Sequence, residues 1–170
     1  MEEIEVKILE INKKETVRKL KRLGAKKVSD GDTNAILFDF PNKKLKKAGK
    51  LLRLRTSGKK IELTLKKKIS KKKTKIMKEH EVDLNDFEIA RDILKGIGLK
   101  ESKIYVKNRT SYKLGKVKFE FDTLPGIPTY LEIEAPTEKI IEKCVKKLGF
   151  SMSDTKPWNA KDILKYYKEK

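Results

Sequence analysis

The stretch "EIEVK", residues 3–7, decides the fold because charged and apolar side chains alternate along it. Alternation with a period of two residues indicates a strand with one charged face and one apolar face. If the charged face meets water, this is an ordinary surface strand. If it faces inward, two carboxylates and an ammonium share an enclosed space, at a free-energy cost that a ligand or a metal could offset.

The same alternation recurs in later segments, namely "LLRLR" (51–55), "IELTLKKK" (61–68), "KEHEVDL" (78–84), "IYVKNR" (104–109), "KFEFD" (118–122) and "YLEIE" (130–134). Two architectures satisfy this pattern. In an open sheet, helices cover the apolar face and the charges meet water, which is the commoner arrangement for any single strand. In a closed barrel, the charges face a lumen, the helices pack outside, and no strand edge is left exposed.

The types of charge along these strands favour the closed barrel. Arg53 and Arg55 lie two residues apart, so they point the same way and offer fork-like donors suited to phosphate oxygens. Glutamates spaced in the same way offer hard oxygen ligands suited to Mg²⁺ or Mn²⁺. Both kinds of pair on one sheet surface would make a site for a metal-bound polyphosphate.

Helical segments with capping signals interrupt the strands. Asn12 and Glu15 have the capping-box spacing at the start of a helix that Gly24 ends, and Asn85 and Glu88 have the same spacing at the start of another. Two more helices are expected near the C-terminus. The lysine-rich stretch between the third and fourth strand segments, residues 69–78, has little pattern and predicts a mobile loop.

Length and composition narrow the classes of protein. The chain has 170 residues and a net charge of +19, which fits either an anionic partner or a lysine-rich proteome of the kind that hyperthermophiles have. Cys144 and His80 are the only residues of their types, which excludes an intrachain disulfide, a zinc–thiolate cluster and a Ser-His-Asp triad. No apolar run approaches membrane-spanning length, so we expect one soluble, cytoplasmic domain over residues 1–170.

In order along the chain, the motifs resemble those of the CYTH proteins, or triphosphate tunnel metalloenzymes. "EIEVK" resembles the family's ExExK signature, and "LLRLR", "LTLK", "EHEVDL", "KNRTSY", "FEFD" and "YLEIE" resemble its later strands. This family includes class IV adenylyl cyclases, thiamine triphosphatases and inorganic triphosphatases. The resemblance implies an α+β fold: a closed antiparallel β-barrel, or tunnel, with a polar, charged lumen and helices packed outside.

The resemblance also implies roles for individual residues. The expected ligands of a divalent cation, Mg²⁺ or Mn²⁺, are Glu3, Glu5, Asp122, Glu132 and Glu134. The expected triphosphate-binding residues are Lys7, Arg53, Arg55, Lys66, Lys107, Arg109 and Lys156. Glu5, Glu81 and Lys7 are the expected catalytic residues. The C-terminal segment "TKPWNAKDIL" departs from the family pattern, because no Ser-Tyr pair follows Lys156.

Three functions remain open from the sequence. We favour a metal-dependent triphosphatase acting on inorganic triphosphate, ATP or thiamine triphosphate, because hydrolysis needs only water and no base-reading pocket is evident. A class IV adenylyl cyclase would use the same lumen to make cyclic AMP and pyrophosphate from ATP. A non-catalytic binder of polyphosphate or RNA is the third, although the basic residues lack the interleaved aromatic side chains that single-strand binding needs, so nucleic acid is not the expected partner. The chain could act as a monomer or a homodimer.

Overall fold

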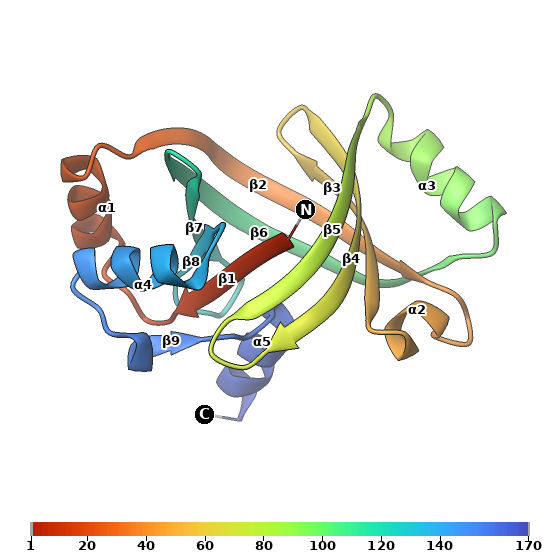
Figure 1. Cartoon of the computed structure of the whole chain (residues 1–170). Helices are drawn as coiled ribbons and strands as arrows, with labels where there is room; N and C mark the ends of the chain where they lie inside the picture. Colours follow the sequence, from red (N-terminus) through yellow and green to blue (C-terminus); the bar gives the residue numbers. More distant parts are fainter. Residues whose placement is uncertain (1, 170) are drawn as a thin grey trace. The chain divides into compact units, whose positions relative to one another are not determined.

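A computed structural model describes residues 2–169 of the chain. Its elements (Figure 1) are, in order, β1 (Glu2–Ile8), α1 (Lys13–Arg22), β2 (Lys26–Asp39), α2 (Lys44–Lys47), β3 (Lys50–Ser57), β4 (Lys60–Lys71), β5 (Lys75–Leu84), α3 (Phe87–Gly96), β6 (Lys100–Leu114), β7 (Val117–Thr123), β8 (Tyr130–Ala135), α4 (Glu138–Lys147), the 3₁₀ turn η1 (Met152–Asp154), β9 (Thr155–Lys156) and α5 (Ala160–Lys168).

The strands form one hydrogen-bonded sheet that returns on itself. The strand order is β5-β4-β3-β2-β6-β7-β8-β1-β9, and β5 also pairs with β1. The neighbours β2–β3, β3–β4, β6–β7, β7–β8 and β8–β1 are antiparallel. The prediction of an α+β fold with a closed antiparallel barrel is therefore confirmed.

Contacts along the chain divide it into two compact units. Unit 1 contains residues 31–69 and 77–107, and unit 2 contains residues 2–30, 70–76 and 108–169. The division falls inside β2, β4, β5 and β6, so each of these strands contributes to both units. The expectation of one domain over residues 1–170 stays a prediction.

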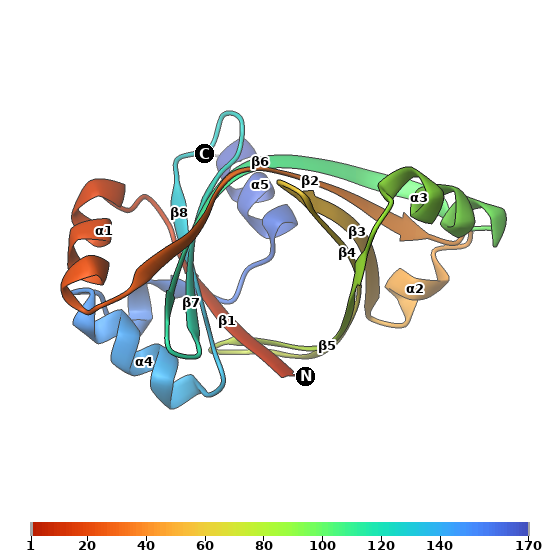
Figure 2. The same ribbon diagram turned by 90° about the horizontal axis from the view of Figure 1, so that it is seen from above.

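In unit 2, helices cover the apolar face of the sheet. Val6 of β1, Phe119 of β7 and Ile133 of β8 are fully buried in one core with Leu20 of α1 and Ile141 of α4. Figure 2 shows α1 and α4 together on one side of β7 and β8. Burying such side chains contributes about 1.5–3 kcal/mol each, which fixes which face of these strands turns toward the helices.

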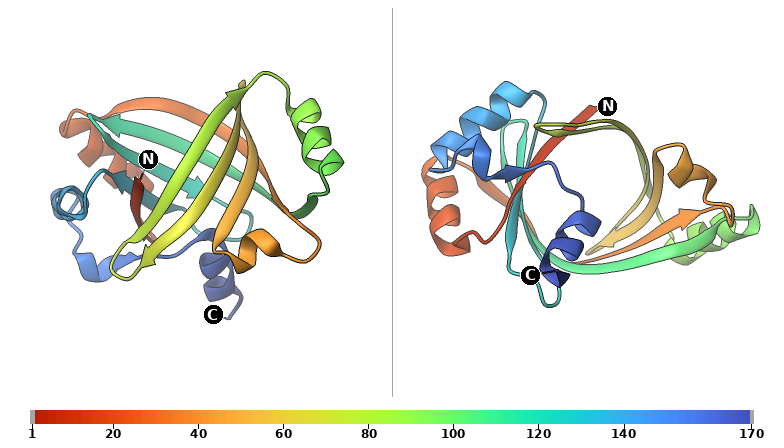
Figure 3. Two further views of the ribbon diagram at one scale, coloured as in Figure 1. Left: turned by 45° about the vertical axis from the view of Figure 1, so that its right-hand side comes forward. Right: turned by 90° about the horizontal axis from the view of Figure 1, so that it is seen from below.

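Unit 1 repeats this arrangement with other elements. Ile36 and Phe38 of β2 and Leu54 of β3 form a core with Leu94 of α3 and the nearby Leu99. Both α2 and α3 contact β3, and Figure 3 shows the two helices beside this strand. In each unit, then, the apolar face meets helices and the charged face is the opposite one.

The C-terminal helix α5 has its own small core in unit 2. Ile163 packs with Leu124, Ile127 and Tyr130, and Trp158 packs against this group. Asn159 caps the helix by accepting hydrogen bonds from two backbone N–H groups, while the Asp162 carboxylate bonds back to the Asn159 N–H. In residues 2–169, no helix combines the length and the apolar character that crossing a membrane requires.

Two local expectations were wrong. The stretch 69–78 is not a loop: β4 runs to Lys71 and β5 begins at Lys75, so only a tight turn separates them. The alternation of period two is hidden there because lysine occupies positions on both faces. The N-cap of α3 is Asp86 rather than Asn85, and its carboxylate accepts a hydrogen bond from the Ile89 backbone N–H.

The N-cap difference gives a stability prediction. Replacing Asp86 with Ala leaves the Ile89 N–H without its acceptor, and we expect the free energy of unfolding to fall by about 0.5–2 kcal/mol. Asn85→Ala is the matched control, and we expect it to change stability by only a few tenths of a kcal/mol. Urea unfolding followed by circular dichroism measures both, and a larger effect at Asn85 would contradict the assignment.

Candidate functional site

The charged face of β1 is buried rather than solvated. Glu5 and Lys7 expose only 2% and 3% of their surface. On the other face of the strand, Ile4, Val6 and Ile8 belong to the unit 2 core. The carboxylate and the ammonium therefore share an enclosed environment, as the inward orientation of "EIEVK" requires.

Lys7 lies between two carboxylates. Its Nζ is 2.5 Å from Glu5 Oε1 and 2.8 Å from Glu132 Oε2. Strand pairing causes this, because Lys7 of β1 stands directly opposite Glu132 of β8. Burial alone would lower the pKa of Lys7, but the charges of Glu132 and Glu5 raise that pKa well above its ordinary value. The side chain therefore remains a buried ammonium.

Arg109 of β6 is the second buried cation of unit 2. It forms a two-pronged pair with Asp122 of β7, in which Nε–Oδ1 and Nη2–Oδ2 are both 2.6 Å. It also pairs with Glu120, and its Nη2 lies 3.6 Å from Glu132 Oε1. Burial would lower the pKa of Arg109, whereas the charges of Glu120, Asp122 and Glu132 raise it well above the usual value. A fixed, always-charged fork of this kind suits phosphate oxygens.

Three carboxylates of unit 2 converge. Oxygens of Glu3, Glu5 and Glu132 lie within 4.8 Å of one another, and we call these residues the carboxylate cluster. Hard oxygen donors are the ligands that Mg²⁺ and Mn²⁺ prefer, so the cluster fits the cation that the resemblance implies. The other two expected ligands, like Glu5 and Glu132, have cationic neighbours: Asp122 is held by Arg109, and Glu134 accepts a hydrogen bond of 2.8 Å from Lys118.

Glu134 is a carboxyl of this site whose pKa is shifted toward neutrality. Burial and the negative charge of Glu3 raise the pKa of Glu134 to about 7, although Lys118 acts in the opposite direction. Glu134 therefore gains or loses its proton near neutral pH. The negative charge beside the carboxylate cluster depends on pH in the same range.

One cation of the site was missed by the sequence analysis. Lys75 Nζ lies 2.8 Å from Glu5 Oε1, the oxygen that also pairs with Lys7. The signal that could have found it is strand parity: counting back in twos along β5 from Glu81 through Glu79 reaches Lys75. The expectation of a loop over residues 69–78 excluded Lys75 from the strand pattern.

The two arginines of β3 lie in unit 1. Arg55 stands opposite Glu62 of β4 and donates to its carboxylate from Nε at 2.8 Å, and Arg53 Nη2 donates to Thr64 Oγ1 at 3.3 Å. Burial raises the pKa of Glu62, but the hydrogen bond from Lys60 and the charge of Arg55 outweigh it and lower the pKa to about 2. The arginines thus share one face of the sheet, as their spacing predicted.

The remaining expected residues have different surroundings. Lys66 pairs with Glu79, and Glu81 lies 3.3 Å from the Thr64 hydroxyl and 4.0 Å from Arg53 Nη2, all within unit 1. Lys107, also in unit 1, is half-buried. In unit 2, Lys156 of β9 pairs in register with Lys7, and its Nζ lies 5.8 Å from the centre of the Trp158 ring.

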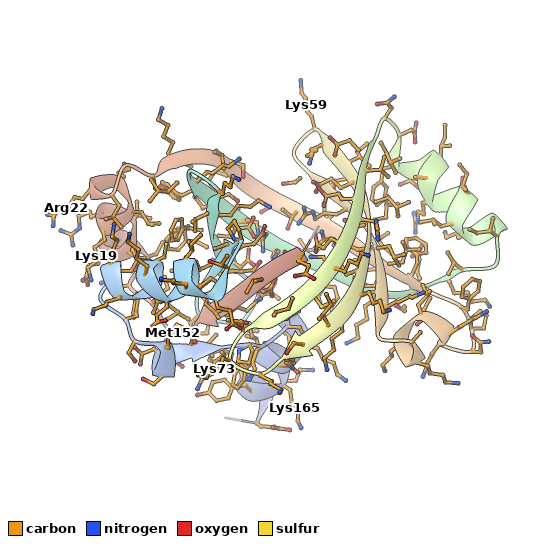
Figure 4. All side chains as sticks on the ribbon, in the orientation of Figure 1. Lys19, Arg22, Lys59, Lys73, Met152 and Lys165 are labelled. Atoms are coloured by element: carbon orange, nitrogen blue, oxygen red, sulfur yellow. The ribbon has the colours of Figure 1, made fainter. Side chains whose placement is uncertain are left out.

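A second group of carboxylates lies in unit 1 and is also paired with a lysine. Glu62, Glu81 and Asp83 bring carboxylate oxygens within 4.8 Å of one another. Lys60 pairs with Glu62 and lies 3.8 Å from Glu81 and 3.1 Å from Asp83. Its neighbour Lys59, at the β3–β4 turn, instead extends away from the sheet, as Arg22 extends away from α1 (Figure 4). Lys59 and Arg22 therefore belong to the positively charged outer surface and not to the charged faces of the strands.

Comparison with known proteins agrees with this geometry. The model of the CYTH domain matches residues 1–167. Over 143 residues, the chain is 30% identical to a Methanocaldococcus jannaschii protein named "Putative adenylate cyclase MJ0240", which covers 84% of this chain and 82% of that protein.

Solved structures share the fold. The PH1012 protein from Pyrococcus horikoshii OT3 superposes with a TM-score of 0.79 at 30% identity, covering 95% of this chain and 98% of that one. The Hippeastrum protein HpAC1, a "putative adenylyl cyclase" described as having a dominant triphosphatase activity, superposes with a TM-score of 0.68, covering 99% of this chain and 96% of that one. Its identity is 14%, so this likeness shows the fold alone. With a domain model that spans nearly its whole length, the chain belongs to the CYTH family.

Proposed function

We propose that this protein is a divalent-metal-dependent triphosphatase that hydrolyses inorganic triphosphate or a nucleoside triphosphate. The observation that carries the proposal is the buried combination, in unit 2, of the carboxylate cluster with Lys7 and Arg109. A relative supports triphosphate chemistry: the M. jannaschii protein, at 30% identity, is named for adenylate cyclase, a reaction that begins with a triphosphate.

In unit 2, the carboxylates and the cations would have different roles. Glu3, Glu5 and Glu132 would hold Mg²⁺ or Mn²⁺, which when bound would polarise phosphate oxygens and offset their charge. Lys7 and Arg109 would bind phosphate oxygens directly and stabilise the charge that develops as the phosphoanhydride bond breaks. Since phosphoryl transfer needs little covalent help from a protein, positioning by these fixed charges supplies most of the catalysis.

The arginines of unit 1 are proposed as further phosphate-binding residues. Arg53 and Arg55 lie on one face of β3 and offer planar donors, and Lys66 lies on the neighbouring β4. Arg55 and Lys66 are each paired with a carboxylate in the structure. A phosphate bound there must therefore compete with Glu62 and Glu79 for these cations. A ligand with more negative charge should compete better, so the affinity of this face for phosphate compounds should increase with their charge.

Hydrolysis is favoured over cyclisation by the environment of the aromatic side chains. Cyclisation requires the nucleoside to be held so that its 3′-hydroxyl faces the α-phosphorus. The one tryptophan, Trp158, is half-buried and packs against the small core of α5, beneath Lys156 and beside Tyr166, so part of its ring is already in contact with the protein. Adenylyl cyclase activity is the second candidate, because the M. jannaschii relative is named for it.

The first activity prediction separates these candidates. With Mg²⁺ or Mn²⁺, we expect phosphate release from inorganic triphosphate or ATP, and little cyclic AMP. Phosphate release is measured colorimetrically and cyclic AMP by chromatography. Cyclic AMP as the main product from ATP would favour the cyclase, and the absence of both products would contradict the enzyme.

The second prediction tests the carboxylate cluster. Glu132→Gln removes one anionic ligand and one partner of Lys7, and we expect turnover to fall by at least about 100-fold. Glu142→Gln, on the exposed surface of α4, makes the same chemical change and should leave turnover within about twofold. A Glu132→Gln variant with normal turnover would exclude this role and favour a non-catalytic polyphosphate binder.

The third prediction uses the pKa of Glu134, which is about 7. Below this pH the carboxyl is protonated and neutral, and above it the anion adds negative charge beside the carboxylate cluster. The affinity for Mn²⁺ should therefore rise as the pH increases from 6 to about 7 and level off above it. Electron paramagnetic resonance of free Mn²⁺ measures this affinity, and Glu134→Gln should flatten the pH dependence. An equally steep dependence in the variant would contradict the assignment.

A further inference from the structure

Two ammonium groups share a single oxygen atom in unit 2. Glu5 Oε1 lies 2.5 Å from Lys7 Nζ and 2.8 Å from Lys75 Nζ. A carboxylate oxygen has two lone pairs, so both are used by these donors. The two lysines also repel each other, and this arrangement is tolerated because carboxylates surround it.

The two lysines are anchored differently. Lys7 stands in register between Glu132 of β8 and Lys156 of β9, keeps 4% of its side chain exposed and has a second partner in Glu132. Lys75 is the first residue of β5, keeps 15% of its side chain exposed, and pairs with Glu5. Lys75 is therefore the partner that Glu5 can lose more easily.

The turn before Lys75 is held in place by the neighbouring helices. The Thr74 hydroxyl donates to Glu138 at the start of α4, and Lys71 Nζ lies 2.6 Å from Asp162 at the start of α5. These contacts fix the backbone on the N-terminal side of Lys75. The long, flexible side chain of Lys75 can then change partner while its backbone stays in position.

We propose that Lys75 is a further substrate-binding residue, which neutralises Glu5 when no metal is bound and transfers to a phosphate oxygen of the triphosphate when a divalent cation takes Glu5. The inference rests on the proposed function. A divalent cation at Glu5 competes with the Lys75 ammonium for the same carboxylate and repels its charge. The displaced ammonium then lies next to the anion that accompanies the cation, where it can form a charge-assisted hydrogen bond.

Lys75→Met tests both halves of this exchange. It keeps the length of the side chain and removes its charge, so Mn²⁺ should bind about three- to tenfold more tightly in the absence of substrate. The complex of Mn²⁺ with a non-hydrolysable methylene-bridged triphosphate should bind about tenfold more weakly. Lys75→Arg should restore most of the affinity for the analogue. Mn²⁺ binding is read by electron paramagnetic resonance and analogue binding by calorimetry.

Lys73→Met is the matched control, because Lys73 is an exposed lysine of the same hairpin (Figure 4). It should change neither affinity. Unchanged Mn²⁺ affinity in Lys75→Met, or unchanged affinity for the analogue, would overturn the proposal. If the unmodified protein turned over no triphosphate, the proposed function would fail, whereas these two binding measurements would still decide the role of Lys75.

Discussion

The structure depends on the burial of opposite charges on one face of a sheet. An isolated ammonium or carboxylate in a protein interior costs several kcal/mol, and the cost is offset only when each charge has well-placed partners. Lys7 between Glu5 and Glu132, and Arg109 on Asp122, meet this condition within unit 2. The apolar side chains that alternate with them explain why the charges stay inside, because turning the strand over would expose the core that α1 and α4 cover.

The buried charges of unit 2 are unequal in number. Among the residues that the structure describes there, the buried cations are Lys7 and Arg109, whereas the buried carboxylates are Glu5, Asp122 and Glu132. The half-buried Glu134 adds to this negative charge only when it is ionised, because burial and the charge of Glu3 raise its pKa to about 7. A divalent cation bound at the carboxylate cluster would reduce the excess of negative charge, so it would also stabilise the folded protein.

The sequence predicted the features that follow from the two-residue alternation of side chains along a strand. It predicted few of the features that follow from which residues stand opposite each other on paired strands. Alternation separated the charged face of β1, β7 and β8 from the apolar face, and the family resemblance indicated that the charged face turns inward. The metal ligands and phosphate-binding residues that the family motifs imply stay predictions. The partner of each charge could not be predicted, because it follows from which residue stands across the strand pair: Asp122 faces Arg109 and Lys7 faces Glu132. Lys75 was hidden because lysines of both parities, Lys75 and Lys78, lie near the start of β5, and Asp86 because two good capping residues are adjacent.

With the proposed function, the shared oxygen of Glu5 would link the fold to the order in which ligands enter. A divalent cation arriving alone would meet Lys7 and Lys75, and a triphosphate arriving alone would meet the carboxylate cluster, so each would be repelled by part of the site. A cation already bound to a triphosphate would present both signs of charge at once, and each sign would have its partners. The ion pairs of Glu5 with Lys7 and Lys75 would therefore be exchanged at least cost for a ligand that carries a cation and an anion together.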